Sequence, residues 1–259
     1  MLTKTLLITG GAAGIGLAVA QRFAREGWQI GLVDLDPQLL QQAADALGEA
    51  CVGHWAVDVS DAPAMKGVVE SFVEQTDGRL RVLFNSAGVL RTGAFAELTP
   101  ATHQQLMAVN VNGVINACHA AYPYLKACPG ARVINMSSAS ALYGVPTMAS
   151  YSASKFAVSG LTEALDIEWA ADDIRVTDIM PPFVRTNMLE SQALKPPIVE
   201  RMGVNLVAED VAEAVWESLD SSAVHHPVGF SFRLLAGASK WTPVSINRAL
   251  MKWLSRPEA

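Results

Sequence analysis

Hydrophobic positions along the 259-residue chain fall into two alternating patterns. Short, almost continuously apolar runs are typical of strands buried on both faces of a parallel sheet. They occur at Thr5–Thr9, Gln29–Val33, Cys51–Val57, Arg81–Asn85, Arg132–Ser137, Ile174–Met180 and Val228–Leu234. Between them, apolar residues recur at helical spacing, at Ile15–Glu26, Pro37–Leu47, Ala62–Gln75, Pro100–Leu125, Tyr151–Ala171 and Glu209–Leu219. The alternation predicts an α/β protein with helices on both faces of its sheet.

Right-handed crossovers between such strands predict a Rossmann-type, doubly wound, three-layer α/β/α sandwich. Its seven-stranded parallel sheet should have the order 3-2-1-4-5-6-7. No repeat or Gly/Ser linker interrupts the alternation, so we expect a single domain over residues 1–259. A long Pro-rich insert over Pro181–Val207 predicts a functional lid at about 187–207.

An apolar tail at about 236–259 follows the last predicted strand. Its residues Ile246, Leu250, Met251 and Leu254 roughly follow helical spacing, and basic residues lie between them. Three interpretations stay open: a helix packed on its own or a neighbouring subunit, a lip over a pocket, and weak, reversible contact with a membrane surface.

The composition is unusually apolar, with 51% hydrophobic and 17% charged residues and a mean hydropathy of +0.25. The longest uncharged stretch, Leu98–Leu125, contains too many Asn, Gln and His residues for a membrane span. We therefore expect no transmembrane segment. The apolar run at the N-terminus is too short for a secretory signal, so we expect a cytoplasmic protein.

Net charge and metal-binding residue types narrow the partners further. The net charge of −6 and the pI of about 5.4 argue against binding to nucleic acid. The three cysteines show no CxxC pairing, which indicates reduced thiols. His225 and His226 lack neighbouring ligands at metal spacing. We expect them in a surface loop and predict no metal site.

A glycine-rich turn follows the first predicted strand and precedes a helix. Gly10, Gly14 and Gly16 would let the backbone approach a pyrophosphate, which the helix N-terminus attracts. A plain tight turn is the alternative interpretation. Asp34 follows the second strand, where a carboxylate accepts hydrogen bonds from ribose hydroxyls and repels a 2′-phosphate. This position favours NAD over NADP, unless Asp34 is only an exposed loop residue.

A possible acid–base group opens the helical segment that starts at Tyr151. The spacing of Tyr151 and Lys155 places them one turn apart on one helix face. The ammonium group should lower the pKa of the phenol, which then suits proton exchange with an alcohol or ketone. Ser138 lies just past a strand end, where its hydroxyl could hold the substrate oxygen. A lone Tyr-x-x-x-Lys pair often occurs by chance, but here it accompanies the glycine turn and Asp34.

Over roughly residues 3–235, the sequence resembles the short-chain dehydrogenase/reductase family, in its compact single-domain branch. The glycine segment resembles the family's TGxxxGIG motif at Thr9, Gly10, Gly14, Ile15 and Gly16. The segment Asn85–Gly88 is similar to the family's NNAG motif, with Ser86 in place of the second Asn. Asp58-Val59 resembles the segment that contacts adenine. Asn110, Ser138, Tyr151 and Lys155 match the family's catalytic tetrad.

The resemblance implies a role for each tetrad residue. Tyr151 would exchange a proton with the substrate oxygen, and Ser138 would orient that oxygen. Lys155 would hold the nicotinamide ribose, while Asn110 would keep a water in a proton relay. The implied cofactor-binding residues are Gly10, Gly14, Ile15, Gly16, Asp34, Asp58, Val59, Asn85, Ala87, Gly88, Tyr151, Lys155, Pro181, Val184 and Thr186.

Two segments depart from the family pattern. After the sixth strand, Pro182 replaces the usual glycine, and proline excludes a left-handed backbone there. Val184 and Thr186 still match. The C-terminus has His226-Pro227-Val228-Gly229-Phe230 and the apolar tail, where tetrameric relatives have a VDGG-like segment.

Together these features predict an enzyme that uses NAD to interconvert a secondary alcohol and a ketone. Apolar residues in and near the lid indicate a small to medium, hydrophobic substrate. The alternatives are a non-catalytic NAD-binding or sensing protein, and a double-bond reductase or epimerase of the same fold. By resemblance, the helix in Leu98–Leu125 is one of two that pair subunits, which predicts a homo-oligomer, either a dimer or a homotetramer.

Overall fold

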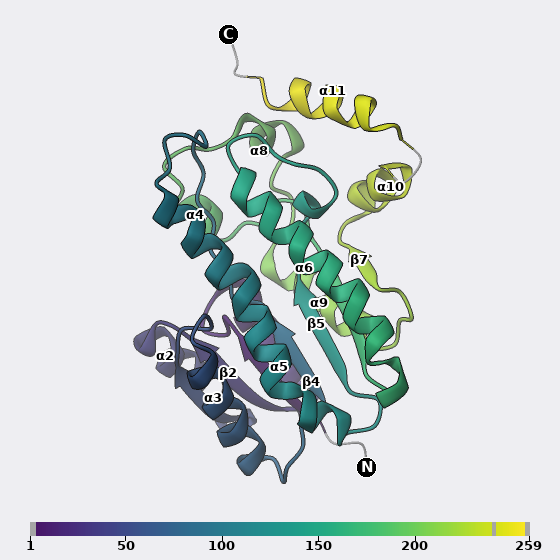
Figure 1. Cartoon of the computed structure of the whole chain (residues 1–259). Coiled ribbons are helices and arrows are strands. Elements are labelled where there is room, and N and C mark those ends of the chain that lie inside the picture. The colour runs from purple at the N-terminus through teal and green to yellow at the C-terminus, as the bar shows by residue number, and fades with distance from the viewer. Residues whose placement is uncertain (1–3, 240–241, 257–259) are drawn as a thin grey trace.

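A computed structural model describes residues 4–239 and 242–256. Seven parallel strands form one sheet with the order β3-β2-β1-β4-β5-β6-β7 (Figure 1). The strands are β1 Thr5–Thr9, β2 Gln29–Asp34, β3 Cys51–Ala56, β4 Val82–Asn85, β5 Arg132–Met136, β6 Arg175–Met180 and β7 His225–Pro227. The predicted fold class and strand order are confirmed.

Helices cover both faces of the sheet. The helices are α1 Gly14–Ala24, α2 Pro37–Leu47, α3 Ala62–Gln75, α4 Pro100–Met107, α5 Gly113–Lys126, α6 Ala149–Glu168, α7 Asn187–Glu190, α8 Pro197–Met202, α9 Ala208–Ser218, α10 Phe230–Ser239 and α11 Val244–Leu254. One core lies between the sheet and α1, α2 and α9, and the other lies beneath α3, α5 and α6. In Figure 1, α5 and α6 lie in front of the sheet.

Local sequence explains where several of these helices begin. Asp36, Asp61 and Thr99 each precede a helix, and their side chains accept hydrogen bonds from backbone N–H groups of the first turn. A proline stands in the first turn of each of these three helices, where its missing N–H costs nothing. The predicted starts of these helices therefore agree with the structure to within a residue.

The prediction for the last strand, Val228–Leu234, was wrong. The strand is β7, it ends at Pro227, and Gly229 turns the chain with φ of +86° into α10. Phe232 and Ala236 are buried against Met180 and neighbouring residues. They are four residues apart, and a helix places residues at this spacing on the same face. His225 and His226, expected in a surface loop, pair with β6 instead. Among the described residues, no cluster of His, Cys, Asp or Glu could hold a metal ion.

The long helix predicted at Pro100–Leu125 is divided. A five-residue π-helix, Ala108–Asn112, separates α4 from α5. Inserted π-turns often mark functional sites, and this one contains the buried Asn110. The sequence pattern missed it because one extra residue in a turn barely changes the helical spacing of apolar positions.

The predicted lid contains two short helices, α7 and α8, and the C-terminal tail packs beside them. Met251 and Leu254 of α11 are buried in one cluster with Leu90, Ile198 and Val199. The tail thus forms a helix on its own chain, and the cluster it joins includes Tyr151. Within residues 4–239 and 242–256, no helix is long and apolar enough to span a bilayer.

Candidate active site

A cavity of about 570 Å³ opens at the carboxyl ends of the strands. Parallel α/β sheets bind their ligands at this edge. The cavity is lined by the glycine-rich turn, the ends of β2 and β4, the start of α6 and the predicted lid. We call the part of the cavity lined by the predicted lid and by the loops after β4 and β5 the apolar chamber.

The glycine-rich turn is shaped for close approach of a ligand. Gly10 and Gly14 have φ of +68° and +53°, which favours glycine at both positions. A Cβ at Gly10 would lie 2.7 Å from the backbone of Ala87, and one at Gly16 would lie 2.0 Å from the Gly10 carbonyl oxygen. Ala13 offers no side-chain cap to the N–H groups at the start of α1, and Gly14, Ile15 and Gly16 line the cavity. This cradle fits the pyrophosphate of a dinucleotide.

Asp34 is held at the cavity edge by backbone N–H groups. Its Oδ2 accepts a hydrogen bond from the Ala12 N–H at 3.1 Å, and its Oδ1 accepts one from the Leu35 N–H at 2.8 Å. The neighbouring residues Ala13 and Leu35 carry no positive charge. Further along the edge, Asp58 Oδ1 accepts hydrogen bonds from Ser60, and Val59 is buried beside it.

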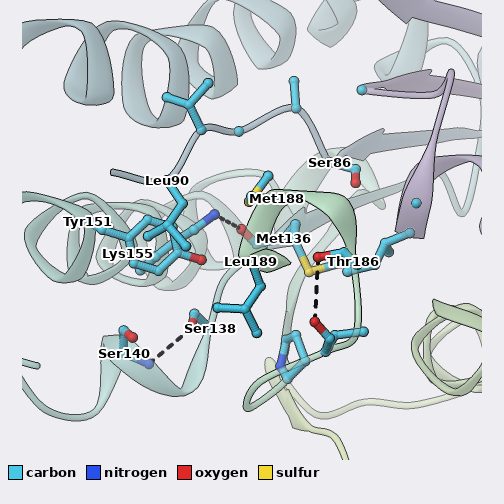
Figure 2. A pocket seen from close by; sticks show the side chains of 18 of the residues that line it. Ser86, Leu90, Met136, Ser138, Ser140, Tyr151, Lys155, Thr186, Met188 and Leu189 are labelled. Carbon is cyan, nitrogen blue, oxygen red and sulfur yellow. Dashed lines mark hydrogen bonds between the residues drawn. The ribbon is translucent and has the colours of Figure 1, made fainter. Parts of the chain in front are cut away.

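Tyr151 and Lys155 lie side by side in the first turns of α6 (Figure 2). The Lys155 Nζ atom donates a hydrogen bond to the Met136 carbonyl oxygen at 2.7 Å. It lies 5.6 Å from the centroid of the Tyr151 ring. Lys155 is 4% exposed, so its ammonium group is largely removed from solvent. The pair is therefore adjacent, as the spacing predicted, but the amine binds main chain rather than the phenol oxygen.

Burial moves the pKa values of both groups. Loss of solvation lowers the pKa of Lys155 from 10.5 to about 8. The same effect raises the pKa of Tyr151 from 10.0 to about 12, and a hydrogen bond with Ser138 opposes it only in part. The expectation that the pKa of Tyr151 is lowered is thus not met in the chain alone, because desolvation outweighs the hydrogen bond with Ser138.

Ser138 lies two residues beyond β5, at the predicted edge. Its extended backbone caps a short 3-10 helix, Ala139–Ala141, and its Oγ accepts a hydrogen bond from the Ser140 N–H at 3.1 Å (Figure 2). The Ala139 N–H donates to the Pro181 carbonyl oxygen at 2.9 Å, which ties this turn to the end of β6. The serine hydroxyl is thereby fixed at the cavity wall beside Tyr151.

Asn110 does not line the cavity but supports its wall from behind. Its Oδ1 accepts from the Val89 N–H at 2.8 Å, and its Nδ2 donates to the Val89 carbonyl oxygen at 3.0 Å. The same Nδ2 donates to Ser154 Oγ at 3.1 Å. A Cβ placed on Gly88 would lie 3.3 Å from Asn110 Oδ1 and 3.9 Å from Lys155 Nζ. The asparagine and lysine thus flank the same glycine.

Asn85 is the other predicted site residue outside the cavity lining. Its buried Nδ2 donates to Asn135 Oδ1 at 2.9 Å, and Asn135 Nδ2 donates to Thr162 Oγ1 at 2.9 Å. Ser86, Ala87 and Gly88, which follow it, do line the cavity. The alternation of side chains along β4 places Asn85 on the same face as Leu83, toward α5, so the side-chain period could have predicted this.

The segment after β6 reaches the cavity despite the proline at position 182. Pro181, Val184 and Thr186 all line it, as predicted, and Val184 forms an isolated bridge with Leu206. Pro182 needs no left-handed backbone there, since the described non-glycine residues with positive φ are Asp77, Thr147 and Asp173.

The apolar wall of the chamber contains residues that the sequence did not single out. Tyr143, Val145, Met148, Phe183, Met188 and Leu189, in and near the predicted lid, line the cavity. Leu90, Ile198 and Met202 join them without having been predicted. In Figure 2, Leu90 and Leu189 lie near the Tyr151 ring. Leu90 lies in a loop, where an apolar residue has no spacing pattern of its own, and α8 (Pro197–Met202) is too short for Ile198 and Met202 to show one.

Comparisons with known proteins identify the family. The family model described as short chain dehydrogenase matches residues 4–196. The chain is 34% identical to 2-(S)-hydroxypropyl-CoM dehydrogenase 3 of Xanthobacter autotrophicus over 82% of this chain and 88% of that protein. It is 31% identical to 3alpha-hydroxysteroid dehydrogenase of Mediterraneibacter gnavus, over 82% and 87%.

A solved structure agrees with this match. The crystal structure of a short chain dehydrogenase from Mycobacterium paratuberculosis bound to NAD has a TM-score of 0.79 and 28% identity. The match covers 87% of this chain and 96% of that one. The protein belongs to the short-chain dehydrogenase/reductase family.

Proposed function

We propose that this oxidoreductase uses NAD to interconvert a hydrophobic secondary alcohol and its ketone. The observation that carries the proposal is the convergence of Ser138, Tyr151 and Lys155 on the cavity that the glycine-rich turn also lines. Similar proteins include dehydrogenases that are named for hydroxylated substrates.

Each residue of the wall has a chemical role. Ser138 Oγ holds the substrate oxygen, and Tyr151 Oη exchanges the proton with it. Lys155 binds the ribose hydroxyls, and its cation favours the phenolate of Tyr151. A bound NAD would supply the hydride-transfer chemistry between the alcohol and the ketone. Asn110 holds the π-helix beside Lys155 and supports a proton relay to solvent.

The cofactor is NAD, held along the polar side of the cavity. The glycine-rich turn binds the pyrophosphate, and Asp34 binds the adenosine ribose. Asp58 and Val59 flank the adenine, while Pro181, Val184 and Thr186 contact the nicotinamide side. Asn85 contributes by fixing the backbone of Ala87 and Gly88. A 2′-phosphate next to Asp34 would bring two negative charges together, with no cation at Ala13 or Leu35 to offset them.

Cofactor preference tests this assignment. Initial rates should favour NAD over NADP by at least about tenfold, the factor that about 1.4 kcal/mol of charge repulsion gives. Asp34→Ala should narrow the ratio by lowering kcat/KM with NAD and raising it with NADP. Asp36→Ala, which removes a nearby carboxylate that caps α2, is the matched control. A wild-type preference for NADP would contradict the proposal.

The apolar chamber supports a hydrophobic substrate of small to medium size. Its wall is formed by aliphatic, methionine and aromatic side chains from the lid and from the loops after β4 and β5. An assay of NADH formation tests both the reaction and the substrate class. It should use a panel of aliphatic, cyclic, polyol and carboxylate-bearing secondary alcohols. We expect the highest kcat/KM for uncharged, apolar alcohols. Preference for a charged alcohol would refute this substrate class.

Assembly and location complete the proposal. The chain acts as one cytoplasmic domain, with 187–207 as the substrate lid. It forms a homo-oligomer, a dimer or a homotetramer, through the face of α5 and α6. Ile115, Phe156 and Ile167 support this because they leave 44%, 46% and 79% of their surface exposed on these helices.

A further inference from the structure

Helices α10 and α11 form a C-terminal cap, which lies outside the sheet at the end of the molecule that carries α8 (Figure 1). Helix α11 contacts α8 directly. Arg201 of α8 donates a hydrogen bond to the Trp253 carbonyl oxygen, and its guanidinium lies 5.7 Å from the Trp253 ring. The cap is therefore a folded part of the surface over the lid.

Charge in the cap is opposite to that of the whole chain. The segment from Phe230 to Arg256 contains no aspartate or glutamate, and its five basic residues are Arg233, Lys240, Arg248, Lys252 and Arg256. The whole chain has a net charge of −6. Such a separation of charge gives the cap a positive potential that an otherwise acidic protein does not need for solubility.

The two long sides of α11 differ. Met251 and Leu254 are 7% and 8% exposed and anchor the helix against the lid cluster. On the opposite side, Arg248 and Lys252 lie one turn apart, at i and i+4. Next to that basic row stand two exposed apolar side chains seven residues apart: Ile246 and Trp253 are 56% and 57% exposed. The outer side of α11 is thus both basic and apolar.

Helix α10 adds a second exposed apolar row. Phe230 and Leu234, at i and i+4, are 78% and 61% exposed. Phe232 and Ala236, on the other side of the same helix, are buried against the end of β6 and the turn after β5. Each helix of the cap therefore buries one apolar face and displays another.

We propose that the C-terminal cap docks reversibly on a membrane surface that contains anionic lipid. Helices that lie in the lipid interface typically combine lysine and arginine with tryptophan and aliphatic residues. A contact between two copies of this surface fits less well, because its basic residues would face like charges. Ile198 and Met202 of α8 line the cavity on the inner side of the lid that the cap covers. Docking would bring the apolar chamber close to a source of apolar alcohols.

Vesicle sedimentation with the full-length protein tests the proposal. The wild-type chain should bind vesicles of phosphatidylcholine mixed with phosphatidylglycerol. It should bind vesicles of pure phosphatidylcholine only weakly. Added salt should weaken the binding because it screens exposed charges. Arg248→Glu with Lys252→Glu should lower the partition coefficient at least about thirtyfold, since each basic residue near an anionic surface contributes about 1 kcal/mol.

A second pair of substitutions separates the apolar contribution. Ile246→Ser with Trp253→Ser should lower binding to the mixed vesicles at least about tenfold, because two apolar side chains no longer enter the interface. Arg25→Glu with Lys66→Glu is the charge-matched control, since both residues are exposed and outside the cap; it should leave binding nearly unchanged. NAD binding and the thermal unfolding temperature check that every variant is folded.

Three results would overturn the proposal. They are no binding of the wild-type chain to the mixed vesicles, equal binding by the cap variants, and equal loss in the control variant. A fall in the molar mass of a cap variant, measured by light scattering without vesicles, would instead assign the exposed face to a contact between subunits. None of these readouts depends on turnover, so they stand apart from a failure of the proposed enzymatic function.

Discussion

Lys155 is a cation in a place that disfavours charge. Its side chain is 4% exposed, and its Nζ atom has a carbonyl oxygen as hydrogen-bond partner rather than a carboxylate. Asp178 attracts the cation, but desolvation is the larger effect and lowers the pKa to about 8. A lysine with a pKa near 8 can change its charge close to neutral pH, while Tyr151 exchanges a proton with the substrate oxygen.

This lowered pKa predicts how stability depends on pH. Between pH 8 and 10.5 the unfolded chain binds the Lys155 proton more tightly than the folded chain, so the free energy of unfolding rises with pH there. Relative to Lys155→Met, the wild-type chain should therefore gain stability from pH 8 to pH 9.5. The gain is at most about 1.4 kcal/mol per pH unit. Denaturant unfolding of both proteins without cofactor measures it.

An exposed lysine provides the control for that experiment. The difference in the free energy of unfolding between Lys66→Met and the wild-type chain should stay constant over the same pH range, because Lys66 lies at the surface of α3. A difference between wild type and Lys155→Met that stays flat with pH would show that Lys155 is not an abnormal acid. A difference that moves in the opposite direction would contradict the sign derived from burial.

Residue-level prediction succeeded where the spacing itself carries the geometry. Tyr151 and Lys155 had to share a helix face, and Ser138 and Asp34 had to lie at the carboxyl edge of a parallel sheet. The pKa values could not be predicted, because they depend on burial that the lid and α11 complete. Asn85 was assigned to the cofactor by motif alone, and its side chain points into the core instead.

At the scale of elements, the His225 side chain on β7 links β6 to α6, in addition to the pairing of β7 with β6. His225 Nδ1 lies 3.0 Å from Asp178 Oδ1 on β6, and His225 Nε2 lies 3.0 Å from Glu163 Oε1 on α6. Asp178 is fully buried, and its other oxygen has no hydrogen-bond partner. The hydrogen bond with Asp178 is the main reason why the pKa of His225 is raised above 6.5.

We expect His225→Ala to lower the free energy of unfolding by about 1 to 3 kcal/mol, because it leaves a buried carboxylate without its donor. The raised pKa means that the folded chain holds the His225 proton more tightly. The loss should therefore be largest below pH 6.5 and shrink as pH rises through the folded pKa. Urea unfolding at pH 6 and pH 9 measures both effects.

His54→Ala supplies a comparison, since His54 is exposed on the edge strand β3. If His225→Ala and His54→Ala cost the same free energy at both pH values, the link between β6, β7 and α6 would carry no stability of its own.

Element prediction worked for strands long enough to show a pattern. β1, β2, β4, β5 and β6 are apolar runs buried in the sheet, and their predicted bounds differ from the observed ones by a residue or so. β7 has three residues, His-His-Pro, with no apolar pattern to reveal it. The apolar residues after Pro227, which suggested a strand, belong to helix α10. That helix packs against the end of β6 and the turn after β5.

At the scale of the whole molecule, the unusually high apolar content has two structural locations. Two cores, one on each face of the sheet, hold a large part of it. The rest includes exposed residues on α5 and α6, among them Ile115, Phe156 and Ile167. An apolar face on two long helices is typical of a subunit contact.

The proposed assembly predicts that Phe156→Glu lowers the molar mass in solution. Two charges facing each other across the contact between subunits would be desolvated without a partner, which costs several kcal/mol per contact. Light scattering should then report a smaller species than for the wild-type chain. Phe95→Glu, at an even more exposed phenylalanine in the loop before α4, should leave the mass unchanged. An unaltered mass in Phe156→Glu would place the subunit contact elsewhere.

The central claim is that Tyr151 performs proton exchange in an NAD-dependent oxidation, and one measurement tests it most directly. The turnover of Tyr151→Phe should be compared with that of the wild-type chain on the best alcohol of the panel, with NAD affinity measured by titration. We predict a fall in kcat of about 10² to 10⁴-fold with nearly unchanged affinity for NAD. Near-normal turnover of Tyr151→Phe would contradict the account.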